Sequence, residues 1–226
     1  MERFKSGFLF QSGCRVLSFI LILVGSLFTT MGCSHTEKVL MPPKVELQAY
    51  RSIGLIEFST NAEDRVKPYL TQNFIEYIQS AQPGTRIFEM GDKDRLLRSV
   101  GRSEFNPEAV QSIGKKYNVD ALIVGHLEVS EIKPRMNIHT APGVLNANAY
   151  IEASLITRIL ETDSGVTFWT RSTSGQTKVA KISVMEGGSF SLGVSDPREK
   201  YGKLIPELVQ ANTSDFRPYY EYRTVK

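Results

Sequence analysis

Cysteine and histidine are scarce in this sequence. The 226 residues include two cysteines, Cys14 and Cys33, and three histidines. Cys14 lies in an N-terminal segment that we expect to be removed, and we expect Cys33 to be modified, so no thiol remains for a disulfide or a metal. The histidines do not pair at metal-ligand spacing, and no His-Glu-x-x-His motif occurs. We therefore expect no metal, no cofactor, and a domain held together by its core alone.

Motifs of nucleophilic and phosphate chemistry are also missing. The sequence has no Gly-x-Ser-x-Gly elbow and no phosphate-binding loop, since Gly187-Gly188 lacks the following Lys-Ser/Thr. His126 and Glu128 share one face of a predicted strand. They form either a general base with its orienting group or a hydrogen-bonded polar end of the strand. With no assembled catalytic set, we predict that the protein is not an enzyme.

A large charge excess is absent as well. The full chain has 27 Lys and Arg against 24 Asp and Glu, and removal of residues 1–32 would leave 24 against 23. This balance gives no basic face for nucleic acid. We expect no nucleic-acid partner.

The sequence lacks a hydrophobic run long enough to cross a membrane as a helix. Its N-terminal apolar run, residues 16–28, has 13 residues, follows a basic segment, and is typical of a signal peptide. Gly32-Cys33-Ser34 follows and resembles the lipid-attachment site of bacterial lipoproteins, although Thr30 stands where an aliphatic residue is usual. The resemblance implies cleavage before Cys33 and acylation of Cys33. An ordinary secretory signal or a short uncleaved anchor are the alternatives.

The remaining chain divides into three predicted parts. Residues 33–50 contain Pro42-Pro43 and no periodicity, which indicates a lipidated tether, and residues 51–213 form the periplasmic domain. Residues 214–226 are an aromatic and charged tail that either packs along the domain or binds a partner. The candidate partner-binding residues are one tryptophan of a predicted hairpin and five residues of the tail: Trp169, Phe216, Arg217, Tyr219, Tyr220 and Tyr222.

Hydrophobic patterning predicts an α/β domain with a mixed β-sheet packed against helices. The predicted order is strand, helix, strand, helices, strand, hairpin, helix. Asn61 is the candidate cap of the first helix, which contains Pro68 and so either starts late or bends. Asn106 and Pro107 mark another helix start, and residues 133–145 are predicted to be a loop. The predicted strands cover 53–58, 85–90, 119–129 and a hairpin over 147–173, and the last helix begins at Asp196.

Several segments of the sequence resemble segments of known envelope lipoproteins. Residues 53–58, 113–125 and 160–166 are similar to the first strand, the passage into the central strand and the hairpin turn of the curli-secretion lipoprotein family. Lipoprotein activators of penicillin-binding proteins and the amino-terminal domain of the Tol periplasmic protein share this fold. The resemblance covers most of residues 50–212 and implies fold and compartment. It departs at residues 134–145 and 181–195, which leave no room for the curli pore hairpins, and the tether is shorter than the activators' linker.

These observations predict a non-enzymatic adaptor or accessory subunit of a cell-envelope assembly, related to peptidoglycan synthesis or secretion. Ser34 favours the outer membrane, because inner-membrane retention signals use Asp after the lipidated cysteine. The expected partners are the membrane, through acyl chains on Cys33, and a periplasmic or outer-membrane protein, with a homo-oligomer left open. The alternatives are an oligomeric secretion-channel component of the curli type and a periplasmic cell-wall hydrolase.

Overall fold

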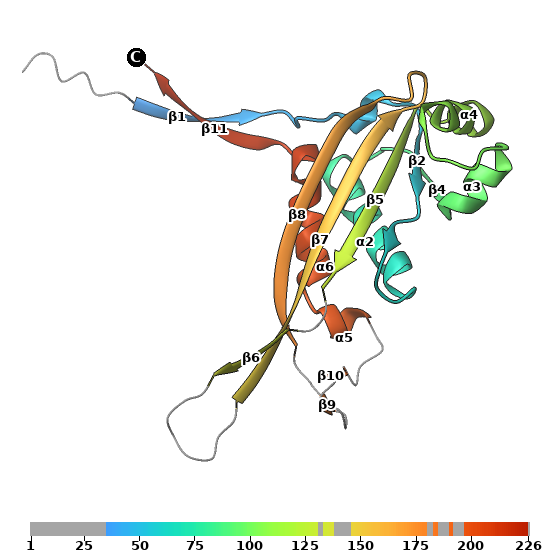
Figure 1. The fold of residues 1–226 in the computed structure, drawn as a ribbon. Coiled ribbons are helices and arrows are strands. Elements are labelled where there is room, and N and C mark those ends of the chain that lie inside the picture. Colours follow the sequence, from blue (N-terminus) through green and yellow to red (C-terminus); the bar gives the residue numbers. More distant parts are fainter. Residues whose placement is uncertain are drawn as a thin grey trace, which may run out of the picture. The chain divides into compact units, whose positions relative to one another are not determined.

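The computed structural model describes residues 35–130, 133–137, 146–179, 183–184, 190–191 and 197–225. Two compact units divide the chain. One is a ribbon of β1 (His35–Met41) and β11 (Tyr219–Val225), and the other is a domain that spans Pro42–Pro218 (Figure 1). The signal segment and Cys33 lie outside the described residues.

The domain is built on a mixed sheet of seven strands among the described residues. β2 pairs in parallel with β4 and β5, because helices connect these strands, and β7 pairs antiparallel with β5 and β8. This arrangement confirms the predicted fold class. The strands are β2 (Ile53–Ile56), β3 (Ser59–Thr60), β4 (Ile87–Gly91), β5 (Ala121–Val129), β6 (Lys133–Asn137), β7 (Asn146–Glu161) and β8 (Thr167–Val179).

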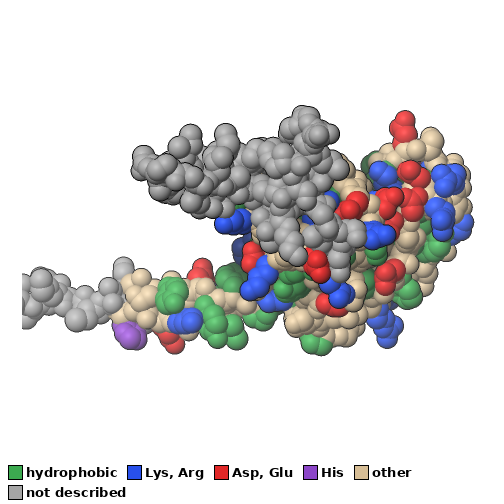
Figure 2. Space-filling model, turned by 90° about the horizontal axis from the view of Figure 1, so that it is seen from below, with side chains coloured by type: hydrophobic (Ala, Val, Ile, Leu, Met, Phe, Trp, Pro, Cys, Tyr) green, Lys and Arg blue, Asp and Glu red, His purple; other side chains and the backbone are tan. Residues whose placement is uncertain are grey.

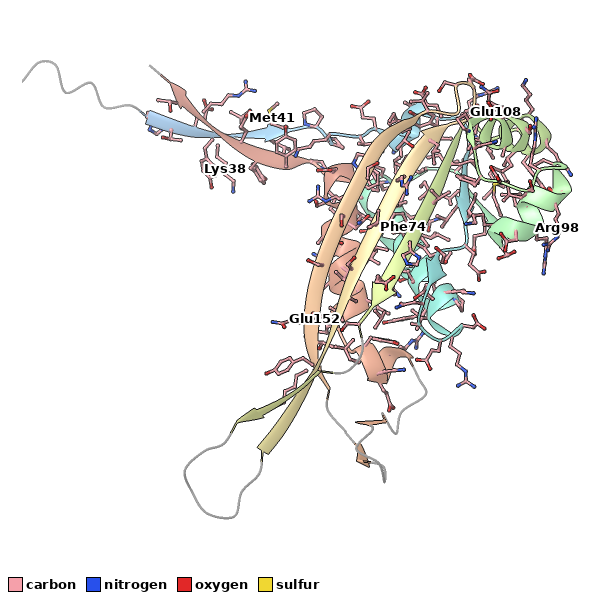
Figure 3. All side chains as sticks on the ribbon, viewed as in Figure 1. Lys38, Met41, Phe74, Arg98, Glu108 and Glu152 are labelled. Carbon is pink, nitrogen blue, oxygen red and sulfur yellow. The ribbon has the colours of Figure 1, made fainter. Side chains whose placement is uncertain are left out.

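One face of the sheet is covered along its length. Alternate residues of β7, among them Leu155 and Ile159, point to this face and are fully buried. They pack against α2 (Val66–Ala81) and α6 (Leu204–Asn212), and Phe74 of α2 lies in this core (Figure 3). Burial of these apolar side chains is the main source of stability for a domain without disulfides.

Among the described residues, helices cover the opposite face at one end only. There α3 (Lys93–Ser99) and α4 (Pro107–Tyr117) contribute Leu96, Val110 and Ile113 to a smaller core. Asn106, predicted to mark a helix start, caps α4 by accepting a hydrogen bond from Ala109 N, and Asp92 caps α3 by accepting one from Arg95 N.

Two prolines lie in the first turns of helices. α2 begins at Val66 and not after Asn61, so Pro68 lies in the first turn, where its missing N–H is tolerated. The last helical segment is divided into α5 (Pro197–Tyr201) and α6, with Gly202 at φ +52° between them and Pro206 in the first turn of α6. The helix therefore starts again after Gly202, and Pro206 lies where its missing N–H is tolerated.

The structure corrects two expectations of irregular chain. Residues 133–137, predicted to be a loop, form β6, which pairs with Asn146–Tyr150 of β7 at the sheet margin, where Pro134 is tolerated. The predicted tether contains β1 and the short helix η1 (Leu47–Ala49), and Leu47 is fully buried in the main core. The domain thus begins at Pro42 and extends past residue 213 through η2 (Thr213–Phe216) to Pro218. The remaining described strands, β9 (Ser183–Val184) and β10 (Phe190–Ser191), pair with each other.

Candidate functional site

The half of the second sheet face that the described helices leave uncovered is a candidate binding surface. Beyond α3 and α4, the even-numbered residues of β5, β7 and β8 point away from the main core. Ile156 is 37% exposed at the centre of this surface. We call it the open face, and its members include Val124, His126, Glu128, Ser154, Ile156, Arg158, Thr170, Ser172, Ser174 and Gln176.

Two hollows lie along the open face. The first, of about 490 Å³, lies between the start of α4 and strands β5 and β7, and Phe105, Pro107, His126 and Arg158 are among its lining residues. The second, of about 550 Å³, lies further along the strands and is lined in part by Glu128, Ser130, Glu152 and Gln176. The first hollow combines apolar side chains with a few charged groups, as is typical of binding surfaces, whereas the second is lined mainly by polar residues.

A chain of hydrogen bonds crosses the open face from β3 to β5. Ser59 Oγ lies 2.9 Å from His126 Nδ1 and 3.2 Å from the carbonyl oxygen of Gly125. His126 Nε2 lies 2.9 Å from a carboxylate oxygen of Glu128, and since a carboxylate only accepts, Nε2 carries a proton. The other Glu128 oxygen accepts from Asn61 Nδ2 at 3.1 Å. His126 and Glu128, which the sequence places on one strand face, are therefore in direct contact. The structure adds Ser59 and Asn61 as their partners.

The setting of this chain favours a structural role. The His126 and Glu128 side chains are 44% and 60% exposed, so water competes for each contact and screens the charges. Asn61 also donates to the Val129 carbonyl and accepts from Val129 N, as a neighbouring strand would. These contacts extend the pairing of β3 with β5. In chemical terms the chain can hold the strand end in place and offer hydrogen bonds to a ligand.

Asp215 forms a cluster of charged and hydrogen-bonded contacts with two residues of β8 and with Lys44. Its carboxylate accepts from Trp169 Nε1 at 3.2 Å and pairs with Arg171 at 2.7 Å and Lys44 at 3.5 Å. Burial by itself raises the pKa of Asp215, but the hydrogen bonds from Arg171 and Trp169 and the charge of Lys44 outweigh it, so the pKa lies below its ordinary value. The main-chain carbonyl of Asp215 accepts from Lys44 N and Val45 N.

Gln82, at the end of α2, joins both ends of the domain. Its side-chain oxygen accepts from Leu47 N at 2.7 Å, and its amide nitrogen donates to the carbonyls of Val45 and Phe216 at 2.7 and 2.9 Å. Gln82 is 5% exposed, and a buried amide requires such partners. One side chain thus fixes the entry and the exit of the domain. No sequence pattern predicts this link, because its members are far apart along the chain.

The candidate partner-binding residues separate into two groups. Phe216 is fully buried and its ring packs against Trp169, with ring centroids 4.9 Å apart. Phe216 therefore belongs to the core, as expected if the start of the tail packs on the domain, and it is not available to a partner. Trp169 lies partly buried at the margin of this core. Arg217 lies over the Tyr77 ring at 5.3 Å. The second group, Tyr219, Tyr220 and Tyr222, lies on β11 and is 37%, 56% and 68% exposed.

In the described ranges no three His, Cys, Asp or Glu side chains are grouped to hold a metal ion. No described helix combines the length and apolarity needed to cross a membrane.

Comparison with known proteins gives similarity of fold. No protein-family model and no curated protein matches the chain. Among solved structures, it is similar to lipoprotein GNA1162 from Neisseria meningitidis, with 13% identity over 57% of this chain and 85% of that one and a TM-score of 0.38. It is also similar to the PelC dodecamer from Paraburkholderia phytofirmans, with 7% identity over 80% of this chain and 96% of that one and a TM-score of 0.40. A third similar structure is the LpoB C-terminal domain from Salmonella enterica, with 10% identity over 69% of this chain and 94% of that one and a TM-score of 0.35. Bacterial lipoproteins are thus among the structures that the chain resembles, as the sequence resemblance implies.

Proposed function

We propose that this protein is a non-enzymatic lipoprotein of the outer membrane that faces the periplasm and binds a protein partner as an adaptor or accessory subunit of an envelope assembly. The observation that carries the proposal is the open face, where helices leave half of a sheet uncovered and two hollows line it. On this face Ile156 and Val124 lie beside Arg158 and Glu128, so it offers a partner both apolar contact area and charged groups.

Two further features support a binding role over catalysis. The Ser59–His126–Glu128 chain is exposed to solvent, whereas catalytic stabilisation depends on a site from which water is excluded. The charges of the open face are of both signs, since Arg158 and Glu128 occur on neighbouring strands. Mixed charges give orientation to a protein partner and do not select a polyanion.

Anchoring is tested by labelling cells with radioactive palmitate. The natural chain should incorporate label, and Cys33→Ala should not. Two or more acyl chains are needed for stable attachment, so the variant should also accumulate as an uncleaved precursor or as a soluble species. Label that persists in Cys33→Ala would refute the anchor.

The binding surface is tested by photo-crosslinking in cells. A photoreactive residue at Ser172, exposed on the open face of β8, should yield a discrete adduct with an envelope protein. The matched control places it at Gln79, exposed on α2. Equal adducts at both positions, or none at Ser172, would contradict the proposal, and turnover of purified peptidoglycan by the purified protein would favour the hydrolase alternative. Adducts only with a second copy of this chain would favour the oligomeric alternative.

A further inference from the structure

The ribbon has two chemically different faces. In its antiparallel register Leu40 lies opposite Tyr220, and Lys38 lies opposite Tyr222. Opposite residues share a face, and neighbours along a strand alternate. One face therefore carries Thr36, Lys38, Leu40, Tyr220, Tyr222 and Thr224, and we call it the tyrosine face. The reverse face carries His35, Glu37, Val39, Met41, Tyr219, Glu221 and Arg223.

Side-chain contacts agree with this division. The Lys38 ammonium lies 4.0 Å from the centroid of the Tyr220 ring, within the tyrosine face. On the reverse face Arg223 lies 3.0 Å from Glu221 and 3.6 Å from the sulfur of Met41. Figure 3 shows the labelled side chains of Lys38 and Met41 on opposite sides of the ribbon.

The tyrosine face exposes apolar area without acidic groups. Leu40, Tyr220 and Tyr222 are 59%, 56% and 68% exposed, and Lys38 is the only charged residue of this face. Both acidic residues of the ribbon, Glu37 and Glu221, lie on the reverse face. Hydrophobic side chains are visible along the ribbon in Figure 2. An isolated two-stranded ribbon is marginally stable in water, so a surface that covers one face would stabilise it.

We propose that the tyrosine face rests on the phospholipid headgroup layer beside the acyl anchor. This inference depends on the anchor proposed above. Cys33 precedes β1 by two positions, and three residues reach at most about 10 Å, so Thr36 stays within that distance of the acylated residue. The register places Val225 opposite His35, which brings the end of β11 to the same place.

The chemistry of the tyrosine face selects a lipid surface over a second copy of the chain. Tyrosine is enriched at membrane interfaces, where its ring meets the acyl boundary and its hydroxyl remains in the headgroup layer. A lysine with a long apolar stem suits the same depth and attracts anionic headgroups. Two copies facing each other through this face would bring their Lys38 charges together. The acidic residues on the reverse face would stay in water.

The test uses the chain's lack of cysteine after Cys33. Thr224→Cys on the tyrosine face and Glu221→Cys on the reverse face, both exposed, are each labelled with an environment-sensitive fluorophore in the acylated full chain. The proteins are added to preformed vesicles of phosphatidylethanolamine and phosphatidylglycerol, and quenching by external iodide is measured. We expect quenching at position 224 to be at least threefold weaker than at 221, with bluer emission.

Controls separate this inference from the anchor itself. The unmutated chain should take up no thiol reagent, because acylation blocks Cys33; uptake together with failure to bind vesicles would refute the anchor. An acylated chain with equal quenching at both positions, or stronger quenching at 224, would overturn the inference alone. Protection at 224 that disappears when the protein is diluted with excess vesicles would identify a second copy as the covering surface and also overturn it.

Discussion

The β7–β8 pair of the domain sheet and the β1–β11 pair of the ribbon are both antiparallel, but only the first is covered by helices. Leu155 and Ile159 of β7 are fully buried under helices, whereas Leu40 and Tyr222 of the ribbon are 59% and 68% exposed. Backbone hydrogen bonds alone contribute little net stability, and burial of a face makes a sheet persist. The difference teaches that the domain is stable through its own core, while the ribbon depends on a surface supplied by its surroundings.

The largest expected effect concerns where the self-supporting region ends. A chain limited to residues 42–218 should unfold cooperatively and retain the stability of the whole protein, because it keeps Leu47, Gln82 and Phe216. A chain limited to 51–213 loses two fully buried side chains and the Gln82 hydrogen bonds, each buried side chain being worth about 2–5 kcal/mol. Circular dichroism with urea should show it largely unfolded. Equal stability of the two chains would contradict the assigned boundary.

A single substitution in each region should show the same contrast. Phe74 is fully buried and its ring centroid lies 5.0 Å from that of Phe58. Phe74→Ala should therefore lower the free energy of unfolding by about 3–5 kcal/mol. Tyr222→Ala should lower it by less than about 0.5 kcal/mol, because the residue is exposed. A comparable loss in both variants, measured by urea unfolding, would mean that the ribbon belongs to the cooperative unit.

Asp215→Asn should have an intermediate and pH-dependent effect. The Asp215 side chain is 16% exposed, and loss of its charged contacts should cost about 1–3 kcal/mol at pH 7. Its folded pKa is lowered, so the folded state binds fewer protons and the stabilisation is complete above the unfolded pKa of about 3.9. The stabilisation is lost as the pH falls through the folded pKa. The difference between natural and variant proteins should therefore shrink below about pH 4, as followed by urea unfolding at each pH; a difference that grows there would refute the sign.

The smallest expected effect is that of His126→Ala. The side chain is 44% exposed, and its contacts with Ser59 and Glu128 are screened, so the loss should be about 0.5 kcal/mol. We predict that this variant changes stability more than function. A thermal melt and an envelope phenotype should be measured together, with Ser59→Ala as the matched control. An unchanged melt with complete loss of function in both variants would favour the enzyme alternative.

Local signals in the sequence were sufficient for much of the domain. Asn106 with Pro107 and Asp92 identify helix starts through side-chain caps that act over three residues. The alternation of Ile151, Leu155 and Ile159 identifies the buried face of β7. These patterns are readable because each element's own residues determine it.

The structural features that the sequence did not predict depend on contacts between residues far apart along the chain. Leu47 is one buried residue in a segment without periodicity, and its burial requires α2 and the C-terminal segment. β1 has no pattern of its own because its partner, β11, comes from the other end of the chain. Ser59 and Asn61 join His126 and Glu128 only through the pairing of β3 with β5. A motif search cannot find such a group, since its spacing along the chain is arbitrary.

The Gln82 amide has a consequence for biogenesis. If the chain is exported from its N-terminus, as proposed above, Val45 and Leu47 are among the first domain residues to cross the inner membrane. Their bonds to Gln82 form early, but the same amide nitrogen also requires the carbonyl of Phe216, more than a hundred residues later. Contacts of such high sequence separation close late and slowly. On the proposed export route, the hydrogen bonds of Gln82 would therefore be complete only after Phe216 has crossed the membrane.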